Sequence, residues 1–321
     1  MSSTEGTGVF IRVGETIPIS NSLQLVGTVF AALFGLAFGS FLNVVISRLP
    51  EGESIVTPGS HCRNCAHTLA WWENLPVLSW LLLRGRCRQC HTRIGLRYPL
   101  IELAAAVLWT AIWLRYGFDF SHSSNFPFLF GQVITKLCGF ALLSLFLVSL
   151  AALDIEFFWL PDGITLPGIA LGVAFRALLL QFREPYPPVD FYDTVSPPNW
   201  KQFAFDISTA VIAAAGLILA IRLAYWLIRR QEGMGLGDAK LMAMLGAWLG
   251  LRGALESFTL AVFGALIAAL VWLAILAVRR KSSEWAKMPL PLGTFLCLGA
   301  LTEIFYPNWL WTAWTHAIFN N

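Results

Sequence analysis

The sequence is poor in charged residues. Only 13% of its 321 residues are charged, about half of the roughly 25% that is usual in soluble domains. Hydrophobic residues make up 57%, above the roughly 45–50% of an average soluble chain. This composition excludes an ordinary soluble globular protein and indicates a polytopic membrane protein.

Three further features are missing. There is no strong basic excess, because the formal net charge is +3; we therefore interpret the basic loops as determinants of membrane topology and expect no nucleic-acid partner. The start of the sequence, from Met1 to Gly6, is polar and lacks the basic region of a signal peptide, so we expect the first apolar segment to be retained. No internal repeat is visible, which speaks against transporters built from inverted repeats.

Long apolar runs are abundant. A helix that crosses a bilayer needs about 20 apolar residues. The sequence predicts an all-α polytopic protein with about eight such helices, at 23–46, 98–114, 129–153, 164–180, 203–228, 239–251, 255–278 and 290–305. The sixth run is too short to span comfortably, and a short helix that follows a glycine-rich segment suits an active site partly sunk in the membrane.

Lys and Arg in short loops predict the orientation, since they favour the cytoplasmic side. They cluster from Arg48 to Arg97, at Arg229 and Arg230, and from Arg279 to Lys281, which all lie on one side if there are eight helices. Both termini are therefore expected outside, with membrane lipid around the helices. The predicted organisation is an outer tail (1–22), a first transmembrane helix (23–46), a cytoplasmic four-cysteine module (47–97), a transmembrane core (98–306) with an outer loop (181–201), and a second outer tail (307–321).

Four of the six cysteines form two C-x2-C pairs separated by 21 residues, namely Cys62, Cys65, Cys87 and Cys90. This spacing is typical of zinc ribbons, in which four thiolates close a tetrahedral structural site. A cytoplasmic location keeps thiols reduced, so zinc is favoured over disulfides. Free thiols or a transient redox pair remain alternatives, and the nearby His61, His67 and His91 are alternative ligands. Cys138 and Cys297 are interpreted as packing residues.

Two carboxylates, Asp154 and Asp238, lie at the ends of apolar runs. Acids at a membrane border are expected to be functional when they face protein or water. The predicted topology brings both to the cytoplasmic face, where an acid pair can activate water. Gly235 and Gly237 should permit positive φ and close backbone approach there.

Structural interpretations of these acids stay open. Asp238 is also a suitable helix N-cap, and Asp154 could simply mark the end of its helix. Asp162 is the rival acid, but Leu-Pro-Asp-Gly predicts a turn in which it caps the following helix. Glu156 is expected to face solvent or lipid headgroups, whereas Glu102 and Asn43 could face a polar cavity. Lys240 could pair with a carboxylate or a lipid phosphate.

Several linked motifs resemble one known family. They are Gly39-Ser-Phe-Leu-Asn-Val-Val-Ile46 with Arg48-Leu-Pro50, the two cysteine pairs, Asn74 to Cys87, Arg97-Tyr-Pro-Leu-Ile-Glu102, Asp154 ahead of Leu160-Pro-Asp162, and Gly235-Leu-Gly-Asp-Ala-Lys-Leu241. Together they resemble the type IV prepilin peptidases, GxGD-class aspartyl enzymes of the bacterial inner membrane. One departure is Arg63, where the family often has proline.

The resemblance implies a bifunctional enzyme. It would cleave the basic leader of prepilins or pseudopilins on the cytoplasmic side and then N-methylate the new amino terminus with S-adenosylmethionine. By motif match, Asp154 and Asp238 are the catalytic pair, while no S-adenosylmethionine-binding residue can be named. Two alternatives are a transporter or channel with an acidic relay and a zinc-stabilised cytoplasmic domain, and a non-enzymatic scaffold that binds partners through its zinc ribbon.

Overall fold

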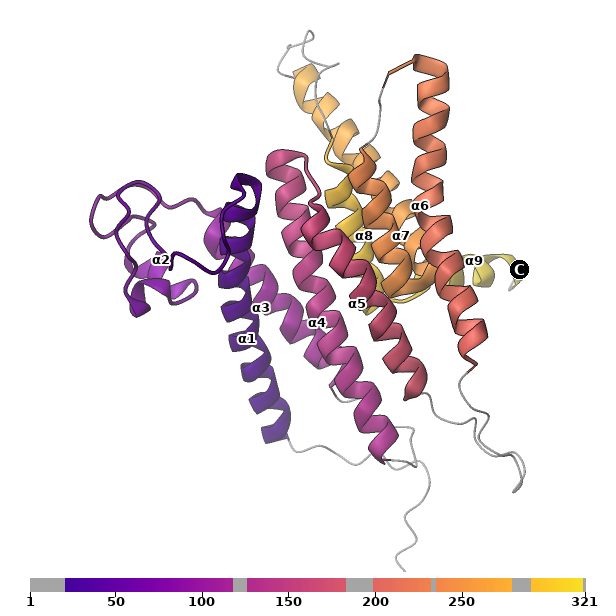
Figure 1. Cartoon of the computed structure of the whole chain (residues 1–321), viewed down its shortest axis with the longest axis horizontal. Coiled ribbons are helices and arrows are strands. Elements are labelled where there is room, and N and C mark those ends of the chain that lie inside the picture. Colours follow the sequence, from indigo (N-terminus) through magenta and orange to yellow (C-terminus); the bar gives the residue numbers. More distant parts are fainter. Residues whose placement is uncertain (1–20, 118–125, 183–198, 232–234, 279–289, 320–321) are drawn as a thin grey trace, which may run out of the picture.

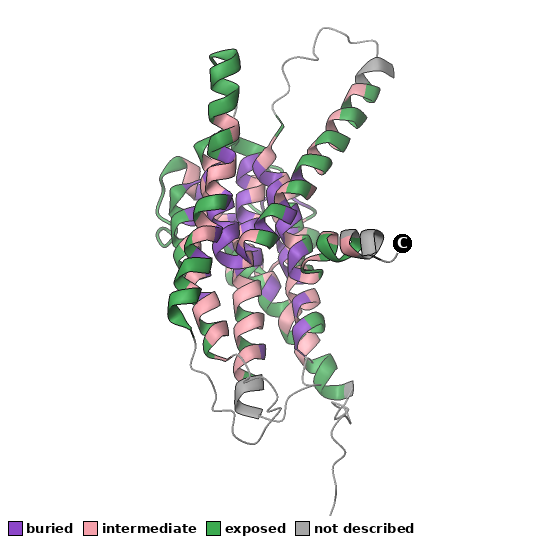
Figure 2. Ribbon diagram, turned by 90° about the vertical axis from the view of Figure 1, so that its right-hand side faces the viewer, coloured by how far each residue is buried: buried purple, intermediate pink, exposed green. Residues whose placement is uncertain are grey.

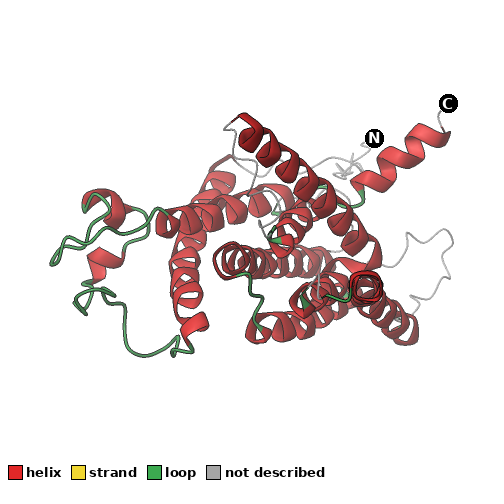
Figure 3. Ribbon diagram, turned by 90° about the horizontal axis from the view of Figure 1, so that it is seen from above, coloured by secondary structure: helices red, strands yellow, loops and turns green. Residues whose placement is uncertain are grey.

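The structure is a computed structural model that describes residues 21–117, 126–182, 199–231, 235–278 and 290–319. Within these ranges it contains helices and loops and no β-strand (Figure 3). The helices are α1 (Asn21–Arg48), η1 (Leu49–Glu51), η2 (Trp71–Asn74), α2 (Leu78–Leu82), α3 (Arg97–Tyr116), α4 (Phe126–Phe157), α5 (Asp162–Gln181), α6 (Trp200–Arg229), α7 (Leu236–Val278), α8 (Leu292–Phe305) and α9 (Trp309–Phe319). The predicted all-α fold is confirmed.

Among the described residues, six helices are long and apolar enough to cross a membrane: α1, α3, α4, α5, α6 and α7. A seventh apolar helix, α8, is shorter. All eight predicted runs fall in helices, but the sixth and seventh both belong to α7. The exact count of eight spans therefore stays a prediction.

Helix α7 is interrupted at Gly250, whose φ of 78° and ψ of 175° are not helical. A side chain there would be strained at this positive φ. It would also meet Arg176, because an added Cβ would lie 2.6 Å from Arg176 Nη1. Figure 1 shows the chain reversing its direction in α7, so the two apolar runs lie on either side of this break.

The buried residues concentrate in the middle of the bundle, and the helix ends are exposed (Figure 2). Helix α7 packs against α5, α6 and α8, and its first part lies in this core. Leu241, Met242 and Leu245 are fully buried, and Trp248 donates a hydrogen bond of 2.8 Å to the carbonyl oxygen of Gly168 in α5. The short sixth run is thus an interior helix that anchors Asp238.

The segment between α1 and α3 projects to one side of the bundle and carries η1, η2 and α2 (Figures 1 and 3). It holds two similar loops, each closed by a single bridge, His61 with Thr68 and Arg86 with Arg93. Most of the predicted outer loop, and the basic run at 279–281, lie outside the described residues. Helix α9 occupies much of the segment predicted as a C-terminal tail.

Candidate functional site: a carboxylate pair and a four-cysteine cluster

The side chain of Asp154 is hydrogen-bonded to the first turn of a helix that is distant in sequence. It lies in the last turn of α4, which ends where Phe158 adopts a positive φ of 50°. Its Oδ2 accepts hydrogen bonds from the backbone N–H (2.7 Å) and the hydroxyl (3.1 Å) of Thr294, in the first turn of α8. The first N–H groups of a helix lack partners within the helix and favour a negative charge. Asp154 satisfies one of them, so α8 fixes the direction of its carboxylate.

Asp238 lies in the first turn of α7 and is half-buried. Its carboxylate accepts a hydrogen bond from the backbone N–H of Gly235, and it lies close enough to Asp154 for the two charges to act on each other. The structure therefore brings together the two acids predicted from the sequence, which are 84 positions apart and belong to different helices. Asp238 is not the N-cap that one interpretation of the sequence made it, because α7 begins at Leu236. Its contact with the Gly235 N–H is compatible with a chemical role, since a carboxylate has a second oxygen that can accept or exchange a proton.

Leu160 packs against Gly237 and Gly293, and this contact joins the segments that carry the two acids. An added Cβ at Gly237 would lie 2.9 Å from the Leu160 Cβ, so the predicted close approach is confirmed at Gly237. The predicted positive φ is wrong, because neither Gly235 nor Gly237 adopts one. Packing, rather than unusual backbone conformation, explains the glycine that precedes Asp238.

Gly293 completes the contact from the side of α8. An added Cβ would lie 3.0 Å from both Asp154 Oδ2 and Leu160 Cδ1. Cys297, one turn further along α8, is buried within electrostatic reach of both acids. From the sequence, no site residue is assigned after Leu251, so the contribution of α8 is not predicted. The signal for it is Pro291-Leu-Gly-Thr294, which stands at the start of an apolar run.

Replacing Gly293 by Ala should slow any reaction of the acid pair by one to two orders of magnitude, because displacing a catalytic group by a fraction of an ångström can cost up to about 10²-fold. Gly163→Ala is the matched control, since an added Cβ there meets nothing within 4 Å. Turnover of both purified variants would check this. Equal activity of the two would contradict the role assigned to the α8 contact.

The other charged candidates form ion pairs. Asp162 is exposed and pairs with Lys240 at 2.5 Å, which links the starts of α5 and α7. It does not cap α5 as predicted, because Pro161 occupies the N-cap position and Asp162 is the first helical residue. Glu156 accepts a hydrogen bond from Arg97 at the start of α3. Glu156 is exposed, as predicted, and through this bond it also ties the end of α4 to the segment after the cysteines.

The four cysteines converge. Their Sγ atoms all lie within 4.8 Å of one another, with 3.7 Å between Cys62 and Cys90 and 3.9 Å between Cys65 and Cys87. Four sulfurs at about 2.3 Å from a common zinc ion would be about 3.8 Å apart. The cluster therefore has the donor set and the spacing of a closed tetrahedral metal site.

The two cysteine loops share one backbone design. In each, the N–H of the first cysteine bonds to a carbonyl five residues on, Cys62 to His67 and Cys87 to Thr92, both at 2.9 Å. The residue after each C-x2-C pair, Ala66 or His91, has a positive φ. This turn points both thiols of a pair in one direction. His61 and His67 instead contact Gly59 and Glu73, so the four-cysteine set is favoured over the histidine alternatives.

Comparison with known families matches both halves of this arrangement. Residues 33–116, with all four cysteines, match the Bacterial Peptidase A24 N-terminal domain. Residues 141–274, with both acids, match the Type IV leader peptidase family. A relative from Burkholderia pseudomallei is 34% identical over 307 residues, covering 86% of this chain and 84% of the relative. The chain belongs to the type IV leader peptidase family.

The Burkholderia protein and two further relatives are named "Prepilin leader peptidase/N-methyltransferase". The protein from Myxococcus xanthus is 37% identical over 252 residues, 77% of this chain and 63% of the relative, which is less than two thirds of its length. The protein from Pseudomonas putida is 32% identical over 301 residues, 86% of this chain and 89% of the relative. No solved structure matches the chain. Family membership and six apolar helices make the chain a multi-pass inner-membrane protein.

Proposed function

We propose that the chain cleaves the leader peptide of type IV prepilins or pseudopilins and then N-methylates the new amino terminus with S-adenosylmethionine. The observation that carries the proposal is the meeting of Asp154 and Asp238, from the end of α4 and the start of α7. The names of the relatives, which state both activities, support it. The scaffold alternative leaves this acid pair without a role, and the family match and the names of the relatives do not favour the transporter alternative.

The acids act as a general acid–base pair. One carboxylate takes a proton from the attacking water, while the other, protonated at the start, gives its proton to the peptide carbonyl oxygen. As the C–N bond breaks, the proton taken from water goes to the leaving amine, and the second carboxyl group recovers its own proton from the hydroxyl that becomes the new carbonyl. The Thr294 hydrogen bonds occupy Oδ2 of Asp154, so its Oδ1 is the oxygen free to exchange a proton with water or substrate. Both acids lie at helix ends, Asp154 at the end of α4 and Asp238 at the start of α7. Water from the membrane surface and a membrane-anchored substrate therefore both have access to the acid pair.

We place the acid pair at the cytoplasmic face, with both termini outside. The contacts that support one common face join the start of α3 to the end of α4, and the start of α5 to the start of α7. The exposed segment with Arg63, Arg84, Arg86, Arg88 and Arg93 lies at this end of the bundle (Figure 1), as the positive-inside rule requires. A prepilin with a basic leader would present its scissile bond at this interface.

Zinc is proposed for Cys62, Cys65, Cys87 and Cys90 as a structural ion. A closed four-thiolate site leaves no position open for substrate, so its role is to hold the two cysteine loops together. We retain the proposed boundaries of 47–97 for the cytoplasmic module and 98–306 for the core. S-adenosylmethionine, when bound, supplies a methyl group on a sulfonium, and the pilin nitrogen can accept it only as a free amine, not while it is part of the peptide bond. Cleavage therefore comes first.

Reconstitution with a prepilin tests the function as a whole. The purified protein in lipid should release the leader, and with labelled S-adenosylmethionine it should then label the new amino terminus. Label should appear only after leader release, because the amine is in a peptide bond until then. Mass spectrometry of the pilin amino terminus reports both steps, and an intact prepilin after prolonged incubation would refute the proposal.

A further inference from the structure

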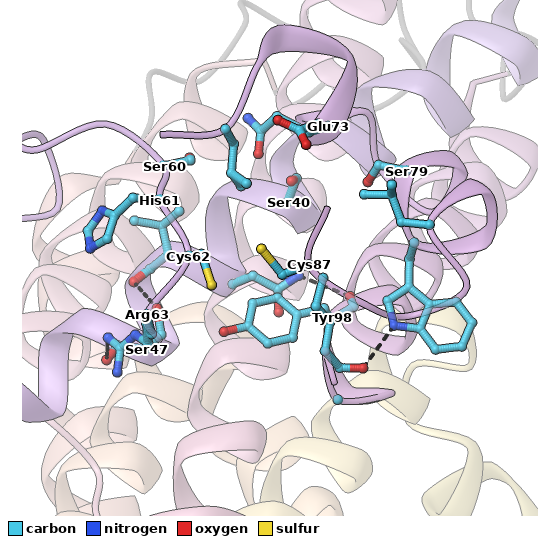
Figure 4. A pocket seen from close by; sticks show the side chains of 18 of the residues that line it. Ser40, Ser47, Ser60, His61, Cys62, Arg63, Glu73, Ser79, Cys87 and Tyr98 are labelled. Atoms are coloured by element: carbon cyan, nitrogen blue, oxygen red, sulfur yellow. Dashed lines mark hydrogen bonds between the residues drawn. The ribbon is translucent and has the colours of Figure 1, made fainter. Parts of the chain in front are cut away.

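A cavity of about 300 Å³ lies between the cysteine module and the ends of α1 and α3 that face it. A volume of this size is at the lower end of that of small-molecule sites. Figure 4 shows Cys62, Cys87, Glu73 and Tyr98 around the same space. The cavity is distinct from the carboxylate pair, because neither acid lines it.

Two buried oxygen atoms of the cavity wall have no hydrogen-bond donor among the described residues, Asn43 Oδ1 and Glu73 Oε1. Asn43 is 3% exposed and Glu73 is 5% exposed. The opposite atoms are engaged: Asn43 Nδ2 donates to the Tyr98 carbonyl at 2.9 Å, and Glu73 Oε2 accepts from the Ala70 N–H at 2.8 Å. Buried polar atoms normally have partners, so these two acceptors call for a ligand that donates.

Charged side chains of both signs line the cavity, namely Arg48, Arg63, Arg88 and Arg93 together with Glu53, Glu73 and Glu102. The N–H of Ala70 and the adjacent His67 hold the pKa of Glu73 below its usual range, so its carboxylate is ionised at neutral pH. Glu102 also lines the cavity, but the Val77 N–H at 2.7 Å already occupies one of its oxygens. Arg88 and Arg93 line the cavity as well and offer guanidinium groups to an anionic part of the same ligand.

The walls also provide apolar and aromatic surface. Trp80 and Tyr98 line the cavity together with Leu69 and Ile94. Trp80 is fixed by a hydrogen bond of 3.1 Å from its Nε1 to the Ile94 carbonyl. The aromatic and apolar side chains suit a ligand with a planar ring at one end, and the charged side chains suit an ammonium, a sulfonium and a carboxylate at its other end.

We propose that this cavity is the S-adenosylmethionine site, with Glu73 and Asn43 accepting the cationic methionine end of the cofactor. The inference deepens the proposed N-methyltransferase function and rests on it. Glu73 and Asn43 are assigned as cofactor-binding residues that the sequence alone does not reveal. The cysteine cluster then acts indirectly, because Cys62 and Cys87 form part of the wall that a metal would fix in place.

The cavity is also connected to the acid pair. Tyr98 in its wall follows Arg97, which donates a hydrogen bond to Glu156, two residues after Asp154. This ion pair joins the start of α3 to the end of α4. A pilin amino terminus released at Asp154 would therefore lie on the side of the bundle where the methyl donor is bound.

Equilibrium binding to the full-length protein in detergent, measured by calorimetry, tests the site without depending on turnover. The probes are S-adenosylmethionine and 5′-methylthioadenosine, which keeps the adenosine part but lacks the ammonium, the carboxylate and the sulfonium. In Glu73→Gln the amide oxygen can still accept from Ala70, but the charge is lost. We expect S-adenosylmethionine to bind about 10- to 100-fold more weakly, as for other charged hydrogen bonds, and 5′-methylthioadenosine to change less than about 2-fold.

Glu51→Gln is the matched control. Glu51 is not among the residues that line the cavity, and its side chain is 53% exposed and pairs with Arg63 at 2.6 Å. Binding of both probes to this variant should stay within about 2-fold of the wild type. An equal loss of both probes in Glu73→Gln would indicate a structural role and overturn the assignment, as would unchanged binding of S-adenosylmethionine. If the wild type cleaves prepilin but does not bind S-adenosylmethionine, the methyltransferase function itself fails, whereas the peptidase function stands.

Discussion

Replacing either Asp154 or Asp238 by Asn should abolish leader cleavage while the protein still inserts and folds. An amide has nearly the shape of a carboxyl group but cannot exchange the proton that water attack and amine departure require. We expect each single substitution to reduce the rate by at least about 10³-fold, within the range of general acid–base catalysis. The double variant should be no worse than either single one, because members of one catalytic unit fail together.

The rival acid provides the control. Asp162 is exposed and pairs with Lys240, and an exposed ion pair contributes little to stability. Asp162→Asn should therefore keep most of the cleavage rate. Leader release by the four purified variants, compared at equal folded concentration, checks the assignment. If Asp162→Asn is as inactive as Asp154→Asn, the first acid has been wrongly chosen.

Removing the first cysteine pair should remove the metal. The purified protein should contain about one zinc ion per chain, since four thiolates complete a tetrahedral shell. With Cys62 and Cys65 replaced by Ser, half of the ligands are gone and the zinc content should fall close to zero. The segment 47–97 should then become sensitive to protease, because the metal would join its two loops and metal binding is coupled to folding.

Cys138→Ser is the matched control for this experiment. Cys138 lies exposed on α4, away from the cluster, so zinc content and proteolysis should match the wild type. Elemental analysis and limited proteolysis of both variants provide the comparison. A metal-free wild type with the same proteolysis pattern as the zinc-loaded protein would rule out a structural zinc ion.

The features predicted from the sequence are those encoded within a few residues. The cysteine pairs are local motifs, and each loop folds by its own hydrogen bonds, so spacing alone was informative. Asp154 and Asp238 were recognisable because each follows or precedes an apolar run, where a charge is costly. Their meeting required the correct direction of every intervening helix, which loop charges indicated.

The features missed depend on contacts between distant segments. Thr294 binds Asp154 across 140 residues of sequence, and Arg97 binds Glu156 across 59. Neither contact has a local pattern, because their geometry arises only when α8 and α3 pack against α4. The reversal at Gly250 was also not predicted, since a glycine within a continuous apolar run is compatible with an uninterrupted helix. The cofactor residues Asn43 and Glu73 likewise come from different elements.

The most direct test of the account supplies the purified Asp238→Asn protein with labelled S-adenosylmethionine and either intact prepilin or pilin whose leader has already been removed. The account predicts no leader release and no label with prepilin, but label on the amino terminus of the pre-cleaved pilin. Leader release at the wild-type rate would contradict the role of the acid pair. Absence of label on pre-cleaved pilin, with a well-folded variant, would contradict two separate sites.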